Sequence, residues 1–341
     1  MKHIILAVES SCDDTGVAVL KGSEVLSNLV ANQDVHSRYG GVVPELASRA
    51  HQSNIVPTIE MAINDAGVEV CDIDAVAYTN GPGLSGSLLV GASFAKSWAW
   101  ANNLPFIPVN HMRAHILAHF ISPGKTPSFP FLCLTVSGGH TQIVRVDSPY
   151  EMEVIGSTLD DAAGEAFDKV AKLIGLPYPG GPLVDKNASK GNSKRFVFSK
   201  SNVKGLNYSF SGLKTQVLRF LQKEVPKNPQ FFEENDQQNL YDFCASVQGA
   251  IIEMLMSKLE KASAQTGIND IAIAGGVSAN SGLRSALEKT SWNVFIPPIK
   301  YCTDNAAMVG MVGVFDFEKK RFGKLSDTPS PRLPDIRKAI V

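Results

Sequence analysis

The chain has 341 residues, of which 44% are hydrophobic and 19% charged, as is usual for a globular protein. That length is enough for two domains with a sizeable core each. The formal net charge of −1 excludes attraction of a nucleic acid by the whole chain, so such a partner would need a local basic patch or another subunit.

The five cysteines are scattered, odd in number and without a Cys-x-x-Cys pair, which favours free thiols in a reducing compartment. No apolar run approaches the ~20 residues of a membrane span. Residues 1–9 lead straight into a strand and lack a small-residue cleavage site, so we expect neither a secretory signal nor a transit peptide. The sequence therefore predicts a cytoplasmic protein without a membrane partner.

The chain begins with three predicted strands. Residues 4–8 are an apolar run typical of a buried strand, and residues 17–20 and 24–30 form two more. The turn at residues 9–16 is rich in acidic and hydroxyl side chains. This pattern predicts a hairpin with a polar turn.

A strand, a glycine-rich loop and a helix are predicted next, over residues 73–78, 79–86 and 87–102. This order of elements directs backbone N–H groups and a helix N-terminus toward an anion. A single Gly-Pro-Gly is, however, more often an ordinary turn than a binding site.

His111 and His115 lie four residues apart. On a helix both imidazoles would face one side, one turn apart, where they can share a metal ion. Met112 stands where the metallopeptidase pattern His-Glu-x-x-His has its Glu, which argues against a peptidase. Two surface histidines on an amphipathic helix are the alternative interpretation of this pair.

The second half of the chain repeats the plan of the first. A second hairpin is predicted over residues 131–136 and 142–146, with small and hydroxyl residues in its turn. A second strand, glycine loop and helix follow at residues 270–274, 275–280 and 281–290. Matching units in one order predict two α/β lobes related by duplication, with a ligand cleft between them.

We expect lobes at residues 1–122 and 123–315, because Pro and Gly cluster near residue 125. A C-terminal segment, residues 316–341, is expected to pack back on the first lobe. The stretch from about residue 180 to about residue 229 is polar, and we interpret it as an irregular insertion.

Ten motifs of the chain resemble those of one family. They lie at residues 4–16, 40–49, 81–84, 111–115, 136–141, 160–168, 178–182, 209–215, 274–280 and 302–308. Together they are similar to the tRNA N6-adenosine threonylcarbamoyltransferase family, in its bacterial or organellar branch. The departures are mild: Asp14 stands where Glu is common, Ala306 where Gly is, and Arg113 where an acid is frequent.

The resemblance implies an α/β fold of two duplicated lobes, the actin-like and sugar-kinase-like (ASKHA) ATPase fold, with a central cleft. It implies transfer of threonylcarbamoyl from threonylcarbamoyl-AMP to N6 of adenosine 37 in tRNAs that read codons beginning with A. The partners it implies are tRNA, threonylcarbamoyl-AMP, a bacterial-type degenerate paralogue subunit and a small ATPase.

The resemblance also implies a metal site between the lobes, with His111, His115 and Asp304 as ligands. Two imidazoles and one carboxylate with open positions suit Fe²⁺, which we favour, and Zn²⁺ fits the same ligands. We expect one divalent ion per subunit. For Asp304 alone, the competing interpretation is an N-cap of the helix predicted at residues 305–315.

A substrate site in the second lobe is implied as well. Its residues are Thr135, Val136, Ser137, Gly138, Gly139, Asp168, Gly181, Asp185 and Asn280. Glycines let backbone N–H groups approach the donor, and the carboxylates accept ribose hydroxyls. Plainer interpretations remain: a two-glycine hairpin, an ion pair of Asp168 with Lys172, and an N-cap at Asn280. Asp13, in the first turn, is our hypothesis for the group that orients or deprotonates the attacking amine.

Basic residues cluster in the insertion, where they form either a contact for the tRNA backbone or a solvated surface run. They are Lys190, Lys194, Arg195, Lys200, Lys204 and Lys214. The alternative function is a sugar- or acetate-kinase-like phosphotransferase of the same fold. It is weakened because Mg-ATP chemistry prefers oxygen ligands. A further alternative is a non-catalytic scaffold.

Overall fold

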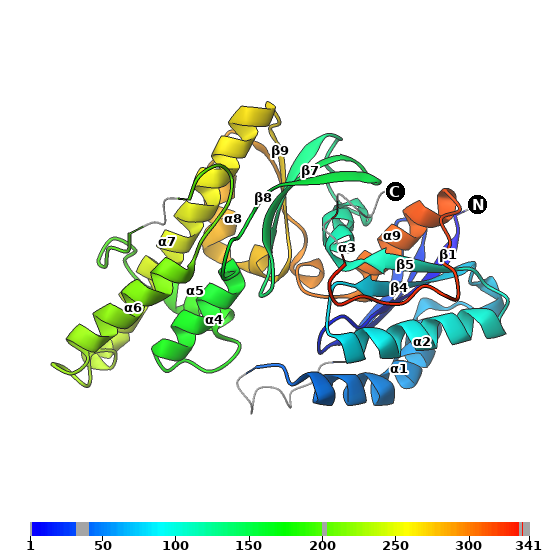
Figure 1. Cartoon of the computed structure of the whole chain (residues 1–341), viewed down its shortest axis with the longest axis horizontal. Coiled ribbons are helices and arrows are strands. Elements are labelled where there is room, and N and C mark those ends of the chain that lie inside the picture. The colour runs from blue at the N-terminus through cyan, green and yellow to red at the C-terminus, as the bar shows by residue number, and fades with distance from the viewer. Residues whose placement is uncertain (1, 32–40, 200–202, 334–335, 337–341) are drawn as a thin grey trace. The chain divides into compact units, whose positions relative to one another are not determined.

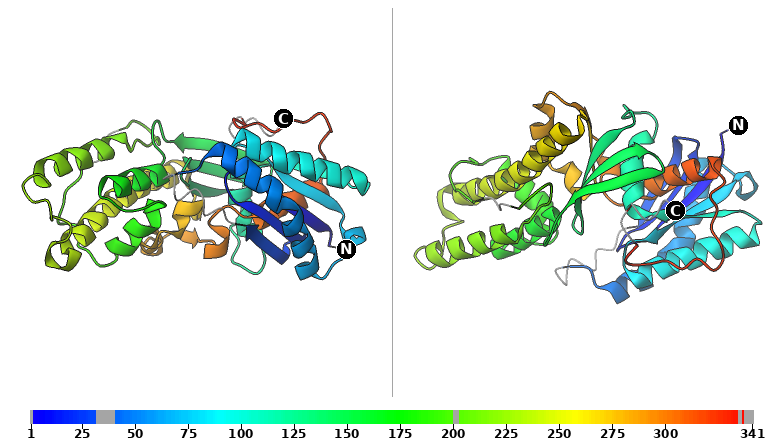
Figure 2. Two further views of the ribbon diagram at one scale, coloured as in Figure 1. Left: turned by 90° about the horizontal axis from the view of Figure 1, so that it is seen from below. Right: turned by 45° about the horizontal axis from the view of Figure 1, so that its top comes forward.

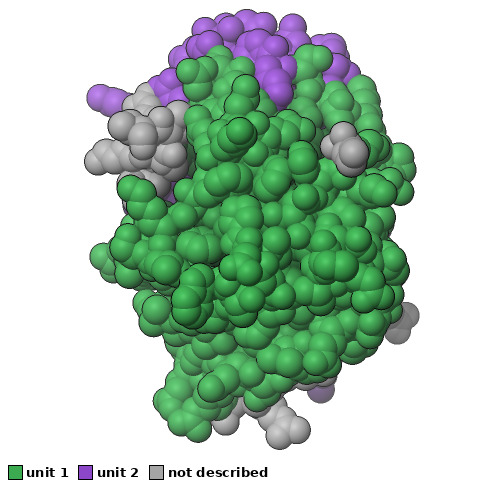
Figure 3. All heavy atoms as spheres, turned by 90° about the vertical axis from the view of Figure 1, so that its right-hand side faces the viewer, with its two compact units in different colours: residues 1–128, 147–152, 297–341 green, residues 129–146, 153–296 purple. Residues whose placement is uncertain are grey.

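The computed structural model describes residues 2–31, 41–199, 203–333 and 336. The chain forms two compact units (Figure 3). Unit 1 comprises Met1–Ser128, Asp147–Met152 and Pro297–Val341, and unit 2 comprises Phe129–Val146 and Glu153–Ile296. Two residues singled out above, Gly40 of a family motif and the basic Lys200, fall outside the described residues.

Unit 1 is built on a five-stranded sheet in the order β3–β2–β1–β4–β5. The strands are β1 (Ile4–Glu9), β2 (Thr15–Lys21), β3 (Glu24–Ala31), β4 (Ala75–Gly81) and β5 (Phe106–Asn110). β2 runs antiparallel to β1, whereas β4 runs parallel to β1 and β5 parallel to β4. β1 and β2 are buried along almost their whole length, which agrees with their near-continuous apolar sequence.

Helices cover both faces of this sheet (Figures 1 and 2). α1 (Pro44–Ala66) and α2 (Ser85–Ala101) pack together on one face, and α9 (Ala306–Glu318) lies on the other, in contact with α3 (His111–Leu117). Glycine lets α9 approach the sheet closely, because a Cβ at Gly310 would lie 2.3 Å from Leu20 Cδ1. α9 is accordingly buried at nearly every position.

Unit 2 repeats the sheet of unit 1. Its order is β10–β9–β6–β7–β8. The strands are β6 (Phe131–Val136), β7 (Thr141–Ser148), β8 (Glu151–Ser157), β9 (Asp270–Ala274) and β10 (Asn293–Phe295). In reverse, this order is β8–β7–β6–β9–β10, so β6 corresponds to β1, β7 and β8 to β2 and β3, and β9 and β10 to β4 and β5. As in unit 1, an antiparallel hairpin lies beside two parallel strands. The predicted duplication is confirmed, and β6 and β9 have the predicted bounds.

The stretch predicted to be irregular contains two helices. α5 (Gly180–Ala188) packs on α4 (Ala163–Leu173) and α7 (Glu234–Thr266), and α6 (Ser211–Glu224) packs on α4. The prediction of an irregular insertion is wrong for these segments. In α6, Leu213, Val217 and Leu221 recur every four positions and are buried. This helical period determines the local structure despite the polar composition.

The C-terminal boundary also differs from the predicted one. Residues 297–315, expected in the second lobe, belong to unit 1, because α9 packs on β1, β2 and β4. Beyond α9 the described residues contact unit 1: Gly323 N donates to Phe106 O at 2.8 Å and Ser330 N donates to Asn80 O at 2.9 Å. In the described part of the chain, no helix is long and apolar enough to cross a bilayer.

Candidate metal centre and substrate site

Helix α3 presents both histidines on one side. Its N-cap is Asn110, the last residue of β5, whose Oδ1 accepts a hydrogen bond from Arg113 N at 3.0 Å. The helix therefore starts at His111, and His115 follows about one turn later. Both side chains are buried, and their rings meet edge to face with centroids 4.7 Å apart.

Asp304 completes a cluster of three ligand atoms. His115 Nε2 lies 3.2 Å from His111 Nε2 and 3.1 Å from Asp304 Oδ1, and His111 Nε2 lies 3.4 Å from Asp304 Oδ1. Ligand atoms bound at about 2.0–2.2 Å to one ion, with bond angles near 90–110°, are roughly 2.8–3.6 Å apart. The cluster therefore fits one metal ion, and it is the one group of its kind among the described residues.

Asp304 reaches the cluster from the residue before the N-cap of α9. The N-cap is Asn305, whose Oδ1 accepts from Met308 N at 3.2 Å. The N-cap interpretation of Asp304 is therefore wrong, which leaves its carboxylate for the histidines. All three ligands belong to unit 1, because α3 and the residues before α9 are both part of it.

A buried carboxylate stands behind His111. Glu9 Oε2 lies 3.2 Å from His111 Nδ1, and Ser11 Oγ lies 3.2 Å from the same nitrogen. Sequence reasoning placed Glu9 in the first turn but missed this contact, because the two residues are 102 positions apart. The signal that was available is an acid at the end of an otherwise apolar strand.

Burial and charge act against each other in this cluster. Burial lowers the pKa of His111, but the carboxylates of Asp304 and Glu9 outweigh burial and hold that pKa well above its ordinary value. Burial raises the pKa of both carboxyl groups, but the His111 imidazole outweighs it, so the pKa of Asp304 is well below its ordinary value and that of Glu9 is lowered. The two carboxylates thus favour a positive charge at this point, whether a proton or a metal ion supplies it.

The first turn, which carries Asp13, is tied to α1. His51 Nε2 lies 2.9 Å from the carbonyl oxygen of Cys12, and His51 Nδ1 lies 2.8 Å from Thr15 Oγ1. A carbonyl only accepts, so Nε2 carries the hydrogen and Nδ1 accepts from Thr15. Asp13 is half-buried in this turn, two residues after the Ser11 that contacts His111.

The predicted substrate residues all lie in unit 2, five of them at the end of β6 and the turn after it. Thr135 and Val136 have buried side chains, and Ser137 Oγ accepts from Gly139 N at 3.3 Å. Gly138 and Gly139 are exposed, neither has a positive φ, and a Cβ at either would meet nothing within 4 Å. Neither packing nor backbone conformation requires glycine at these two positions, and the backbone there is open to solvent.

Asp168 holds the start of α5. Its Oδ1 accepts from Gly180 N at 2.8 Å and from Gly181 N at 3.0 Å, at a helix whose N-cap Pro179 offers no side-chain bond. These bonds replace the expected ion pair with Lys172. Asp168 Oδ2 has no partner among the described residues and is available to a ligand.

Asp185 and Asn280 are both engaged at the start of α8 (Ser281–Glu288). Asp185 accepts from Ser281 N at 3.0 Å and from Ser281 Oγ at 2.7 Å. Asn280 Oδ1 accepts from Leu283 N at 2.9 Å, and its Nδ2 donates to Gln248 Oε1 at 2.7 Å. The N-cap interpretation of Asn280 is confirmed, and a ligand would have to use the remaining hydrogen-bonding capacity of these side chains.

The basic residues of the insertion differ in availability. Lys194, Lys204 and Lys214 are exposed. Arg195, in contrast, pairs with Asp242 at 2.8 Å, and Lys190 Nζ lies 5.0 Å from the centre of the Tyr241 ring.

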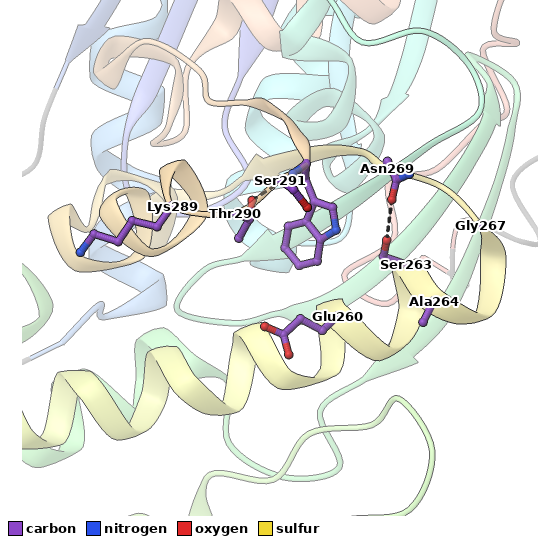
Figure 4. Close-up of a pocket in the computed structure, with 9 residues that line it drawn as sticks. Glu260, Ser263, Ala264, Gly267, Asn269, Lys289, Thr290 and Ser291 are labelled. Atoms are coloured by element: carbon purple, nitrogen blue, oxygen red, sulfur yellow. Dashed lines mark hydrogen bonds between the residues drawn. The ribbon is translucent and has the colours of Figure 1, made fainter.

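A pocket of about 600 Å³ lies elsewhere in unit 2 (Figure 4). It is lined by Glu260, Ser263, Ala264, Gly267, Asn269, Lys289, Thr290, Ser291 and Trp292. Asn269 precedes β9 and Trp292 precedes β10, so the pocket lies at the amino ends of two parallel strands. Ligands of open α/β sheets bind at the carboxyl ends. The pocket is therefore not part of the candidate site, which includes Asn280 in the loop after β9.

Two sheets of one strand order, each with a hairpin beside parallel strands, define the class of the protein: it has the actin-like, sugar-kinase-like fold. Solved structures support this class. T. kodakarensis HypF matches with a TM-score of 0.62 at 13% identity, covering 93% of this chain and 48% of that chain. The (R)-2-hydroxyglutaryl-CoA dehydratase component A of Acidaminococcus fermentans matches with a TM-score of 0.52 at 14% identity, covering 94% of this chain and 99% of that chain.

The chain belongs to the tRNA N6-adenosine threonylcarbamoyltransferase family, whose model matches residues 24–311. Relatives that bear this name match over almost the whole chain. The relative from Christiangramia forsetii is 58% identical, covering 96% of this chain and 97% of its own length. Those from Riemerella anatipestifer and Porphyromonas gingivalis are 56% and 53% identical, each covering 97% of this chain and 98% of its own length. The resemblance seen in the motifs is confirmed.

Proposed function

We propose that this chain transfers the threonylcarbamoyl group from threonylcarbamoyl-AMP to N6 of adenosine 37 in tRNAs that read codons beginning with A. The product is N6-threonylcarbamoyladenosine. The observation that carries this proposal is the His–His–Asp cluster of unit 1 in a chain of this family. The turn at Gly138 and Gly139 supports it, because the fold itself does not require these glycines.

The cluster would hold one divalent ion per subunit, with Fe²⁺ favoured and Zn²⁺ as the second candidate. Two imidazoles and one carboxylate, with further positions open, suit both ions. When bound, the ion supplies a Lewis acid that holds and polarises oxygens of the donor. Metal analysis of protein purified without air identifies the ion.

The donor would bind to unit 2. The backbone at Gly138 and Gly139 is open to its phosphate or carbamoyl oxygens, and Asp168 Oδ2 is free to accept a hydrogen bond from a ribose hydroxyl. Gly181, whose N–H already bonds to Asp168, leaves room for the nucleoside against the backbone. Asp185 and Asn280 fix the start of α8 beside this site and have lone pairs left for the donor.

The reaction replaces a C–O bond of the donor with a C–N bond to the acceptor. N6 of the adenine attacks the carbamoyl carbon, the bond from that carbon to the phosphate oxygen breaks, and AMP leaves with the electron pair while N6 loses a proton. Asp13 is our hypothesis for the group that orients the amine or takes this proton. A mixed anhydride is a reactive donor, so positioning supplies much of the acceleration. Full transfer activity in Asp13→Asn would contradict this role.

The acceptor is accessible without much distortion. Adenosine 37 lies in a single-stranded loop, where unstacking a base takes little free energy. The exposed Lys194, Lys204 and Lys214 are the proposed contacts for the tRNA backbone. The net charge of −1 gives the chain little attraction of its own for tRNA, which supports a need for partner proteins.

The proposed partners are a degenerate paralogue subunit and a small ATPase, in the cytoplasm. Exposed apolar side chains on α1 and α2 support a partner subunit: Met61 is 58% exposed, Leu89 52% and Trp100 73%. Exposed apolar side chains are often found where a protein contacts a partner. Free cysteines at all five positions agree with a reducing compartment.

The test of the proposed reaction uses labelled threonylcarbamoyl-AMP, the purified chain and its partner proteins. We expect label in a tRNA transcript that carries adenosine 37 and none in the same transcript with guanosine 37. Equal labelling of both transcripts would contradict adenosine 37 as the acceptor. No labelling, combined with ATP-dependent phosphorylation of a sugar or carboxylic acid, would favour the phosphotransferase alternative.

A further inference from the structure

Glu9 is a buried acid at the end of β1, with 1% of its surface exposed. Its Oε1 accepts from Ser11 N at 2.6 Å, and its Oε2 accepts from Thr79 Oγ1 at 2.6 Å. Oε2 also lies 3.2 Å from His111 Nδ1. One carboxylate thus joins three segments of unit 1: the first turn, the end of β4 and the start of α3.

The contact with Glu9 fixes the tautomer of His111. An ionised carboxylate only accepts hydrogen bonds, so in the neutral imidazole, the form that binds a metal ion, the hydrogen lies on Nδ1. The lone pair then lies on Nε2, the nitrogen that is 3.2 Å from His115 Nε2 and 3.4 Å from Asp304 Oδ1. Glu9 thereby turns the ligating nitrogen toward the other two ligands.

His115 has no such partner. Its Nδ1 is buried and makes no hydrogen bond to any described residue. This ring is held by packing, since its side chain is 2% exposed, and by the contacts of its Nε2 with Asp304 and His111. The two histidines of the cluster are therefore not equivalent, because only His111 has a hydrogen-bond partner on the nitrogen that faces away from the other ligands.

We propose that Glu9 is a positioning residue of the metal centre, which orients His111 through Nδ1 and increases the basicity of its Nε2. Ser11 and Thr79 hold the carboxylate in place for this role. This inference rests on the proposed metal centre and adds that the affinity for the ion depends on β1 and β4. Losing such a carboxylate partner typically weakens metal binding about 10–100-fold.

The test measures binding of Co²⁺ to the full chain after its metal has been removed with a chelator. The wild type should bind one ion per chain. Glu9→Gln keeps the size of the side chain but replaces one acceptor oxygen with a donor, and its Kd should be about 10–100-fold higher. Thr79→Val removes one bond to Glu9 and leaves His111 in place, so its Kd should rise by less. The absorption spectrum of bound Co²⁺ reports the ligand geometry independently of activity.

Asp242→Asn is the matched control, because Asp242 is also a buried carboxylate but belongs to unit 2. Its Kd for Co²⁺ should equal that of the wild type. Thermal unfolding of the metal-free variants shows how much of any effect is general destabilisation. A Glu9→Gln variant with unchanged Kd, or with a rise that Asp242→Asn shares, overturns the proposal. A wild type that binds no ion overturns the metal centre itself, which is a distinguishable outcome.

Discussion

Gly180 and Gly181 are neighbours in the sequence with opposite structural requirements. A Cβ at Gly180 would lie 2.2 Å from Ala171 Cβ, whereas the nearest atom to a Cβ at Gly181 is Phe167 Cβ at 3.8 Å. The fold therefore requires the first glycine and has room for a methyl group at the second. The substrate site was expected to use only the second.

Gly181→Ala should leave the free energy of unfolding unchanged or raise it by up to about 1 kcal/mol, because alanine favours helix over glycine. It should also weaken binding of threonylcarbamoyl-AMP. Gly180→Ala is the control and should lower the free energy of unfolding by about 1–3 kcal/mol through overpacking. Urea unfolding and titration with the donor check both results. An unchanged donor affinity in Gly181→Ala would remove this residue from the site.

Asp242 gives a prediction about pH. It accepts hydrogen bonds from Asn192 N at 2.7 Å, Arg195 Nη1 at 2.8 Å and Gln238 Nε2 at 2.8 Å. Burial raises its pKa, but the bonds from Arg195, Asn192 and Gln238 outweigh burial and lower the pKa below 3.8. A lowered pKa in the folded state stabilises the fold above the unfolded-state pKa, and this stabilisation is lost as the pH falls through the folded-state pKa.

Asp242→Asn should therefore lower the free energy of unfolding at pH 7 by about 1–3 kcal/mol. We expect the low end of that range, because the Arg195 side chain is 42% exposed and solvent screens the pair. The difference from the wild type should shrink below about pH 4. Urea unfolding at a series of pH values measures it, and a constant difference down to pH 2 would contradict the assignment.

At the scale of residues, the sequence predicted where side chains lie on an element better than it predicted their hydrogen-bond partners. The spacing of His111 and His115 predicted their shared helix face correctly. The partners of Glu9, Asp185 and Asn280 lie 102, 96 and 32 positions away, and local patterns carry no information about such pairs.

At the scale of elements, α3 and α9 are the helices that bring the metal ligands together. An ion pair joins them: Arg113 Nη1 lies 2.6 Å from Asp316 Oδ2, and Arg113 Nη2 lies 2.8 Å from Asp316 Oδ1. Arg113 Nε also donates to Pro149 O at 2.9 Å. Arg113, which departs from the family pattern, therefore links α3 to α9 through this ion pair.

Asp316→Ala should lower the free energy of unfolding by about 3 kcal/mol, because it leaves a mostly buried guanidinium without its anion. It should also raise the Kd for metal, since α3 loses a tie to α9. Exchanging the charges, Arg113→Asp with Asp316→Arg, should recover part of the stability. Urea unfolding and Co²⁺ titration of Asp316→Ala, of Arg113→Asp, of Asp316→Arg and of the exchanged double variant check this. A double variant no more stable than either of its single variants would contradict it.

Strands and helices with clear periodicity were predicted well. β6 and β9 agree with their predicted bounds, and α2 starts two residues before its predicted start. α5 and α6 were missed because their apolar residues are few and their exposed faces polar. Residues 297–315 were assigned to the wrong lobe because their place depends on the packing of α9 against a sheet formed by residues near the other end of the chain.

On the scale of the whole molecule, the repeated strand order accounts for the two lobes, and the near-zero net charge limits how tRNA is held. Exposed lysines of unit 2 are the proposed contacts. A phosphate contact made by a single cation contributes about 0.7–0.9 to the slope of log affinity against log salt concentration.

Changing Lys194, Lys204 and Lys214 together to Glu should weaken tRNA binding at least tenfold and reduce this salt slope, because each lysine lost removes a phosphate contact. The same charge change at three exposed lysines of unit 1, Lys21, Lys319 and Lys320, is the control. Filter binding at several salt concentrations measures both sets. If both triple variants weakened tRNA binding equally, the net charge of the chain and not these lysines of unit 2 would account for the effect.

The most direct test of the account compares wild type and His111→Ala for threonylcarbamoyl transfer to an adenosine-37 transcript, with partner proteins present and metal content measured on both. We predict that the wild type carries one ion per chain and transfers the label, whereas His111→Ala remains folded but loses both the ion and the transfer. Transfer by His111→Ala at the wild-type rate would contradict the role of the His–His–Asp cluster. Absence of transfer by the wild type would contradict the proposed reaction.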